Sequence, residues 1–142
     1  MDEPVPPDEL ARRILQAILD DMYPLTDELF RRRSWVHGAN PGVYGSSLTE
    51  VVCELDWKIP YLTGELAPHT PLDEHQLASL REFHVHFMKF VDERLPQNFG
   101  SCYPSEELAA DGWHELTQRA KGVLEEISRN LGSDQVPPSV KR

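Results

Sequence analysis

When the segment from Thr70 to Leu95 is drawn as a helix, it is apolar around most of its circumference, and this narrows the folds open to the chain. Apolar side chains recur there at steps of three and four residues, which places them on one broad stripe. A helix of this kind normally packs on several sides, so we expect it in the middle of a helical bundle. The stripe consists of Leu77, Leu80, Phe83, His84, Phe87, Phe90 and Val91, and it is widened by Val85 and Met88.

The ends of this helix carry their own signals. A hydroxyl at Thr70 followed by Pro71 is typical of a helix start, because the hydroxyl accepts from an exposed amide and the proline lacks an amide that would go unpaired. Pro96 is expected to end the helix, since proline disfavours the α conformation for the residue before it.

Helical periodicity also predicts four other segments, and no alternating strand pattern of useful length is present. Pro24 is expected to end or kink the first helix, and Pro60 to break the third. Ser47 and Glu50 are spaced as a capping box at the start of that third helix. The predicted fold is an all-α bundle of four to five helices around the central helix, with helices near residues 8–22, 26–33, 47–59, 70–95 and 105–131.

The chain length of 142 residues suits one domain, which we place at residues 8–132. Residues 1–7 read as a flexible lead-in and residues 133–142 as a disordered tail. No apolar run approaches the ~20 residues of a membrane span, and the N-terminus is acidic where a secretory signal would be basic and then apolar. Cys53 and Cys102 lack zinc spacing and read as reduced thiols, so a cytoplasmic location is expected.

The net charge of −10 limits the partners of the chain. Nucleic-acid binding depends on Lys and Arg side chains that neutralise phosphates, so the charge argues against it. A basic protein is the better electrostatic match, although a merely solvated acidic face fits the same composition. The candidate contacts are four carboxylates of the last predicted helix and one loop aromatic, namely Glu106, Glu107, Asp111, Glu115 and Trp35.

Three further features have two interpretations each. The arginines at 31–33 suit the C-terminal end of a helix, and they also suit an anion contact. The glycine-rich loop 34–46 is either a site or a connection, with Trp35, His37 and Tyr44 as its candidate residues. His84 falls in the apolar stripe, which predicts a buried histidine bonded to a neighbouring element, with a ligand or a titrating group as the alternative.

A metal site is the sharpest enzymatic hypothesis. Glu82 and His86 stand four residues apart, and Asp111 and His114 stand three apart, so each pair shares one helix face. Ligands of this mixture suit Zn, Fe or Mn, which would activate a water molecule at an open position. Against this, Glu82 and His86 occupy the polar strip of their helix, and the spacing matches neither the Glu-x-x-His of di-iron bundles nor the HExxH of zinc proteases.

These observations give three functional hypotheses. The first is a non-catalytic acidic protein that binds a basic protein partner and neutralises it, in the manner of an inhibitor or immunity protein. The second is a metal-dependent helical-bundle enzyme that uses the two pairs above. The third is a helical scaffold or regulator with an apolar groove for another helix. A monomer and a homodimer both suit the sequence.

Overall fold

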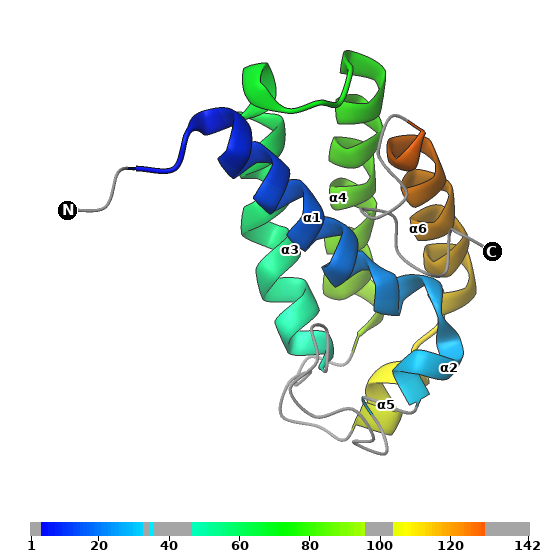
Figure 1. The fold of residues 1–142 in the computed structure, drawn as a ribbon. Coiled ribbons are helices and arrows are strands. Elements are labelled where there is room, and N and C mark those ends of the chain that lie inside the picture. The colour runs from blue at the N-terminus through cyan, green and yellow to red at the C-terminus, as the bar shows by residue number, and fades with distance from the viewer. Residues whose placement is uncertain (1–3, 33–34, 36–46, 96–103, 130–142) are drawn as a thin grey trace.

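The computed structural model describes residues 4–32, 35, 47–95 and 104–129, and its regular elements in this part of the chain are all helical. The predicted all-α fold is therefore confirmed (Figure 1). Within the same residues, no helix is both long and apolar enough to cross a membrane. The elements are α1 (Pro7–Thr26), α2 (Glu28–Arg31), α3 (Leu48–Thr63), the 3-10 helix η2 (Ala67–His69), α4 (Glu74–Arg94), α5 (Pro104–Leu108) and α6 (Trp113–Ser128).

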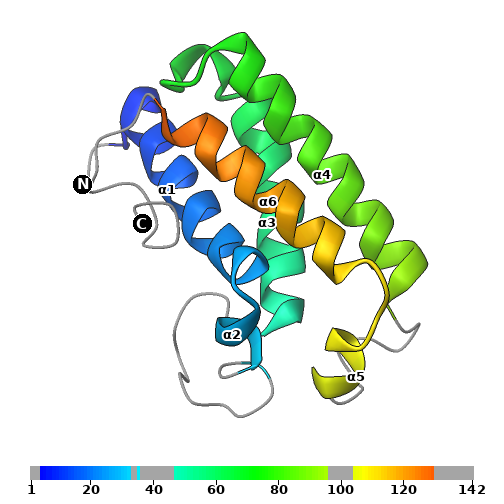
Figure 2. The ribbon, with the colours of Figure 1, turned by 90° about the vertical axis from the view of Figure 1, so that its right-hand side faces the viewer.

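The four long helices α1, α3, α4 and α6 form the bundle, as Figures 1 and 2 show from two directions. Both α1 and α4 pack against α3 and α6, so α1 lies across the core from α4, and α3 across the core from α6. Phe83 and Phe87 project from α4 into this core, where their rings stack with centroids 5.8 Å apart. The other fully buried large side chains are Leu15, Ile18, Leu19, Met22, Leu25, Leu55, Ile59, Leu62, Leu80 and Leu124.

The helix α4 occupies one corner of the bundle and not its middle. Val85, which was expected to widen the buried stripe, is 63% exposed, and Met88 is only half-buried. The buried stripe is narrower than expected, because α4 makes extensive contacts with two helices, α3 and α6. Its apolar width therefore exceeds what the bundle uses.

Pro24 does not end α1, and Pro60 does not break α3. Pro24 lies inside α1 and Pro60 inside α3, each within the last turn or so of its helix. A proline costs most in a helix interior, where it removes a hydrogen bond and its ring clashes with the preceding turn. Near the end the loss is smaller, and the hydroxyls of Thr26 and Thr63 donate to the carbonyls of Tyr23 and Ile59, which caps the last turn. The last turn of each of these helices thus accommodates a proline.

Side-chain caps set the other boundaries. The hydroxyl of Ser47 accepts from the Glu50 amide at 3.2 Å, as predicted for the start of α3. The start of α4 was wrong by several residues, because Asp73, and not Thr70, is the N-cap, and it forms a reciprocal capping box with Gln76. The short helix α2 likewise begins after Asp27, and its Leu29 is 56% exposed.

The predicted helix 105–131 is two helices in the structure. Gly112 has a φ of +99°, a left-handed conformation that ends the helical path and separates α5 from α6. Gly122, by contrast, lies inside α6 without breaking it. The last residues of the predicted domain, 130–132, and the tail 133–142 lie outside the described residues, as do the first three residues of the lead-in 1–7.

One of the three arginines has a structural position that favours the helix-end interpretation. The Arg31 guanidinium donates to the carbonyls of Pro24 and Leu25 at the end of α1, both at 2.9 Å, and to the Thr117 hydroxyl at 3.2 Å. It also lies 4.7 Å from the ring centroid of Trp113. Burial lowers the Arg31 pKa to about 10, so the side chain stays charged at neutral pH. Arg32 pairs with Glu28 on the surface, and Arg33 lies outside the described residues.

Replacement of the two glycines by alanine is expected to have opposite effects. Gly112→Ala places a Cβ in a left-handed conformation and 3.4 Å from the Phe90 ring, so we expect a loss of about 1–2 kcal/mol in the free energy of unfolding. Gly122→Ala meets nothing within 4 Å in the middle of a helix, so we expect a gain of about 0.5–1 kcal/mol. Urea unfolding measures both, and equal effects would contradict the boundary at Gly112.

A buried ion pair joins α1 to α3. The Lys58 ammonium lies 2.7 Å from an Asp21 carboxylate oxygen, with the two side chains 8% and 2% exposed, and 3.1 Å from Glu54 at the rim. Burial raises the pKa of Asp21, although Lys58 opposes that shift. Burial lowers the pKa of Lys58, but the hydrogen bonds that its ammonium donates to Asp21 and Glu54 outweigh this effect and leave the pKa raised. The stability that Lys58 contributes is thus kept at neutral pH and lost only as pH rises through this raised pKa.

Removal of one partner should be costly, whereas removal of both should not. Lys58→Met leaves the Asp21 carboxylate buried without its cation, so we expect a loss of about 3 kcal/mol in the free energy of unfolding at neutral pH. The double variant Asp21→Leu/Lys58→Met is expected within about 1 kcal/mol of wild type.

The deficit of Lys58→Met relative to wild type is also expected to shrink as pH falls from about 7 to about 4, because an unpaired buried carboxyl takes up a proton. Chemical denaturation across pH measures both effects. A double variant as unstable as Lys58→Met would show that the pair is not the cause.

Candidate interaction surface

The outer face of α3 is acidic and carries a large exposed aromatic ring. Glu50 and Asp56 are exposed and Glu54 is half-buried at the rim of the face. Trp57 lies among them with 48% of its surface exposed. The one cation of α3 is Lys58, and it is turned into the bundle toward Asp21. We call this set, Glu50, Glu54, Asp56 and Trp57, the α3 face.

The ring of Trp57 is held in place by its neighbours on α3. Its indole N–H donates to a carboxylate oxygen of Glu54 at 3.1 Å, and its ring centroid lies 6.4 Å from that of Tyr61. The Lys58 ammonium lies 5.7 Å from the same ring. An aromatic side chain that is fixed before binding loses little conformational entropy on contact with a partner. The α3 face therefore presents a preorganised apolar surface within a ring of carboxylates.

His84 borders this face from α4. Its ring nitrogen Nε2 lies 3.0 Å from a carboxylate oxygen of Asp56, which joins α4 to α3 at the surface. The expected contact with a neighbouring helix is confirmed, but His84 is half-buried and not enclosed in the core. The position of His84 in the apolar stripe predicts deeper burial. The stripe, however, is wider than the part of α4 that α3 and α6 cover.

The structure divides the five residues that the sequence selected for partner contact. Glu106, Asp111 and Glu115 are exposed near the start of α6, where Glu115 pairs with Arg119 at 3.3 Å. Glu107 and Trp35 are each only 6% exposed, so neither suits the contact role that we gave it.

The aromatic packing near Gly112 explains both burials. Trp35 packs on Trp113 with ring centroids 6.2 Å apart, and the Trp113 indole N–H donates to the Glu107 carbonyl at 2.9 Å. Trp35 thus belongs to the core, as the alternative interpretation of loop 34–46 had it. The other residues of that loop, including His37 and Tyr44, lie outside the described residues, as does Cys102.

The sequence did contain a signal for Trp57. Val51, Leu55 and Ile59 follow one another at four-residue steps and are buried, and Trp57 falls two residues from the last two, on the opposite side of the helix. An aromatic residue off the buried stripe of an amphipathic helix is either a cover for a neighbouring element or an exposed contact. Only the packing arrangement separates these alternatives, so the sequence alone did not select it.

The two candidate metal pairs do not come together. Within residues 4–32, 35, 47–95 and 104–129, no three His, Cys, Asp or Glu side chains are grouped closely enough to hold a metal ion. Glu82 and His86 lie 3.6 Å apart on the outer side of α4, while Asp111 and His114 are exposed on either side of Gly112. The four-ligand site that the sequence suggested is thus not assembled by these residues.

Thermal unfolding with added metal tests this geometry directly. A ligand that binds only the native state must raise its melting temperature. Glu82 and His86 supply only two ligands. We therefore expect that added Zn, Mn or Fe(II) at low stoichiometric excess does not shift the melting temperature of wild type or of Glu82→Gln. A shift in wild type that Glu82→Gln or His86→Gln removes would restore the metal hypothesis.

No family model, no curated protein and no solved structure matches this chain. We therefore infer a function from the surface chemistry of the described residues.

Proposed function

We propose that the protein is a non-catalytic interaction protein that binds a basic protein partner through the α3 face. The observation that carries the proposal is the combination of three carboxylates with the half-exposed Trp57 on a helix whose one cation is buried. The proposal keeps the partner class expected from the net charge of −10 and moves the contact from α5 and α6 to α3.

The two components of the α3 face have different tasks in such a complex. Carboxylates at an interface mainly steer a basic partner and raise the association rate, and their effect falls with salt. Tryptophan is enriched among the few residues that supply most of the binding free energy, particularly at the centre of an interface. Trp57 is flanked along the helix by Glu54 and Asp56, which suits a central anchor with a charged rim. An inhibitor or immunity protein would bind its target in this way.

Removal of the Trp57 ring should abolish most of the affinity. We expect Trp57→Ala to weaken partner binding by about 2 kcal/mol or more, roughly thirtyfold in Kd, mainly through faster dissociation. The double variant Glu50→Gln/Asp56→Asn should instead slow association at low salt. The matched control is Glu106→Gln/Asp111→Asn, which removes the same charge from exposed positions beside α5 and α6.

The measurement begins with affinity capture of basic proteins from extract of the source cells on immobilised wild-type protein, at low and at high salt. The captured protein is then purified and titrated against wild type and the three variants. Equal binding by wild type and Trp57→Ala would contradict the α3 face. Weaker binding by the control double alone would return the contact to α5 and α6.

A further inference from the structure

The outer surface between α4 and α6 contains two adjoining hollows that share His86 and Arg119. The first hollow, of about 280 Å³, is lined by His86, Lys89, Phe90, Glu93, Arg94, Gly112, Glu115, Leu116 and Arg119. The second, of about 290 Å³, is lined by Ser79, Glu82, Phe83, His86, Arg119, Gly122, Val123 and Glu126. Figure 2 shows α4 and α6 next to each other on this side of the molecule.

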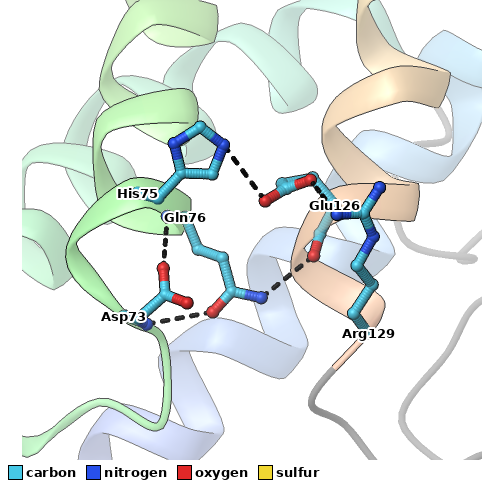
Figure 3. A network of polar contacts seen from close by, with 5 residues as sticks. All are labelled: Asp73, His75, Gln76, Glu126 and Arg129. Atoms are coloured by element: carbon cyan, nitrogen blue, oxygen red, sulfur yellow. Dashed lines mark hydrogen bonds and ion pairs between the residues drawn. The ribbon is translucent and has the colours of Figure 1, made fainter.

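A polar network fixes the two helices at one end of this surface (Figure 3). Gln76 at the start of α4 donates to the Glu126 carbonyl near the end of α6 at 2.9 Å, and His75 contacts the Glu126 carboxylate at 3.3 Å. Arg129 holds the same carboxylate at 2.9 Å. Glu126, one of the two carboxylates that line the second hollow, is thereby engaged by His75 and Arg129, whereas the first hollow lies toward the opposite end, beside Gly112.

The first hollow concentrates positive charge on a strongly acidic protein. Lys89, Arg94 and Arg119 line it against the two carboxylates of Glu93 and Glu115, while the chain as a whole carries −10. Lys89 and Arg94 have no ion pair or hydrogen bond among the described residues, and Arg119 has one contact, to Glu115 at 3.3 Å. Within the described residues, Lys89 and Arg94 thus hold no other group in place, and Phe90 and Leu116 give the hollow an apolar floor.

We propose that the first hollow binds a small phosphorylated molecule. Arginine and lysine are the side chains that recognise phosphate, by bidentate hydrogen bonds and as a point charge. A hollow of about 280 Å³ is slightly below the usual range of ~300–1,000 Å³ for ligand pockets, which suits a phosphate with a short organic part over the apolar floor. An anionic membrane is a poor source of this phosphate, because it repels a protein of net charge −10.

This site is separate from the α3 face, since α3 lies across the core from α6. The proposal does not depend on the protein partner, and the two are tested independently. If phosphate binds but no protein partner is found, the proposal for the first hollow alone is supported. If a partner binds but phosphate does not, the proposal for the α3 face alone is supported.

The test is a titration of the full-length ¹⁵N-labelled protein with inorganic phosphate and with phenyl phosphate, at ionic strength held constant with sodium chloride. Saturable shifts are expected for the amides of Phe90, Gly112 and Leu116, with tighter binding of phenyl phosphate because its ring contacts the apolar floor. The double variant Lys89→Gln/Arg94→Gln is expected to weaken binding about tenfold, since charged hydrogen bonds are lost. The matched control, Arg12→Gln/Lys121→Gln, removes two exposed cations that line neither hollow and should bind as wild type does.

One variant should gain affinity, and misfolding does not produce a gain. Glu93→Gln removes a negative charge from the lining, so we expect phosphate to bind about threefold more tightly. No saturable shift with either probe, or equal losses in the two double variants, would overturn the proposal. Co-sedimentation with phosphatidic acid vesicles that Lys89→Gln/Arg94→Gln abolishes would overturn the assignment to a soluble ligand.

Discussion

The ion pair between Lys58 and Asp21 connects the packing of this protein to its surface chemistry. Lys58 is the one cation of α3, and its ammonium lies inside the bundle, 2.7 Å from an Asp21 carboxylate oxygen on α1. A buried ion pair gives little net stability, because desolvation of both charges offsets most of their attraction. Its larger effect here is on the surface, where it leaves the carboxylates of the α3 face without a neighbouring exposed cation on their own helix.

The other cations of the bundle are divided between its interior and its surface. Arg31 is buried against Trp113 and the last carbonyls of α1, so this cation serves the packing of α1 and α2 on α6. Lys89 and Arg94, near the end of α4, remain on the surface without partners among the described residues. Some cations are buried and others are exposed. As a result, a chain of net negative charge has two faces of different character. Net charge alone therefore does not show where on the surface a contact would lie.

Much of the fold follows from local patterns that can be read from the sequence. The start of α3 at Ser47 and the buried periodicity of α1, α3, α4 and α6 depend on neighbours within one or two turns, which the sequence displays. The exact start of α4 at Asp73 was misplaced because two capping residues, Thr70 and Asp73, stand close together, and only the capping box with Gln76 distinguishes them. Pro24 and Pro60 were misread because the cost of a proline depends on its distance from the helix end.

The candidate site was less accessible to sequence reasoning, because exposure depends on which neighbour covers a residue. Glu107 and Trp35 looked like surface groups by residue type and loop position, yet the break at Gly112 folds α5 back so that Trp113 bonds to the Glu107 carbonyl and packs on Trp35. Trp57 lies off the buried stripe of α3, and its half-exposed position depends on which elements pack beside that helix. For Glu107 and Trp35 the cause is Gly112, whose left-handed conformation changes the direction of the chain before α6 and with it the set of side chains that face solvent there.

The distribution of polar groups also bears on the choice between binding and catalysis. Catalytic acids and bases depend on groups that converge in a desolvated site, where burial and neighbouring charges adjust their pKa values. In the described residues, the most buried ionisable side chains are those of Asp21, Arg31, Lys58 and Glu107, and the first three are engaged by partners inside the bundle. The α3 face and the first hollow are instead open surfaces whose charges meet solvent. Such surfaces suit recognition, in which charges steer a partner and one aromatic ring supplies the affinity.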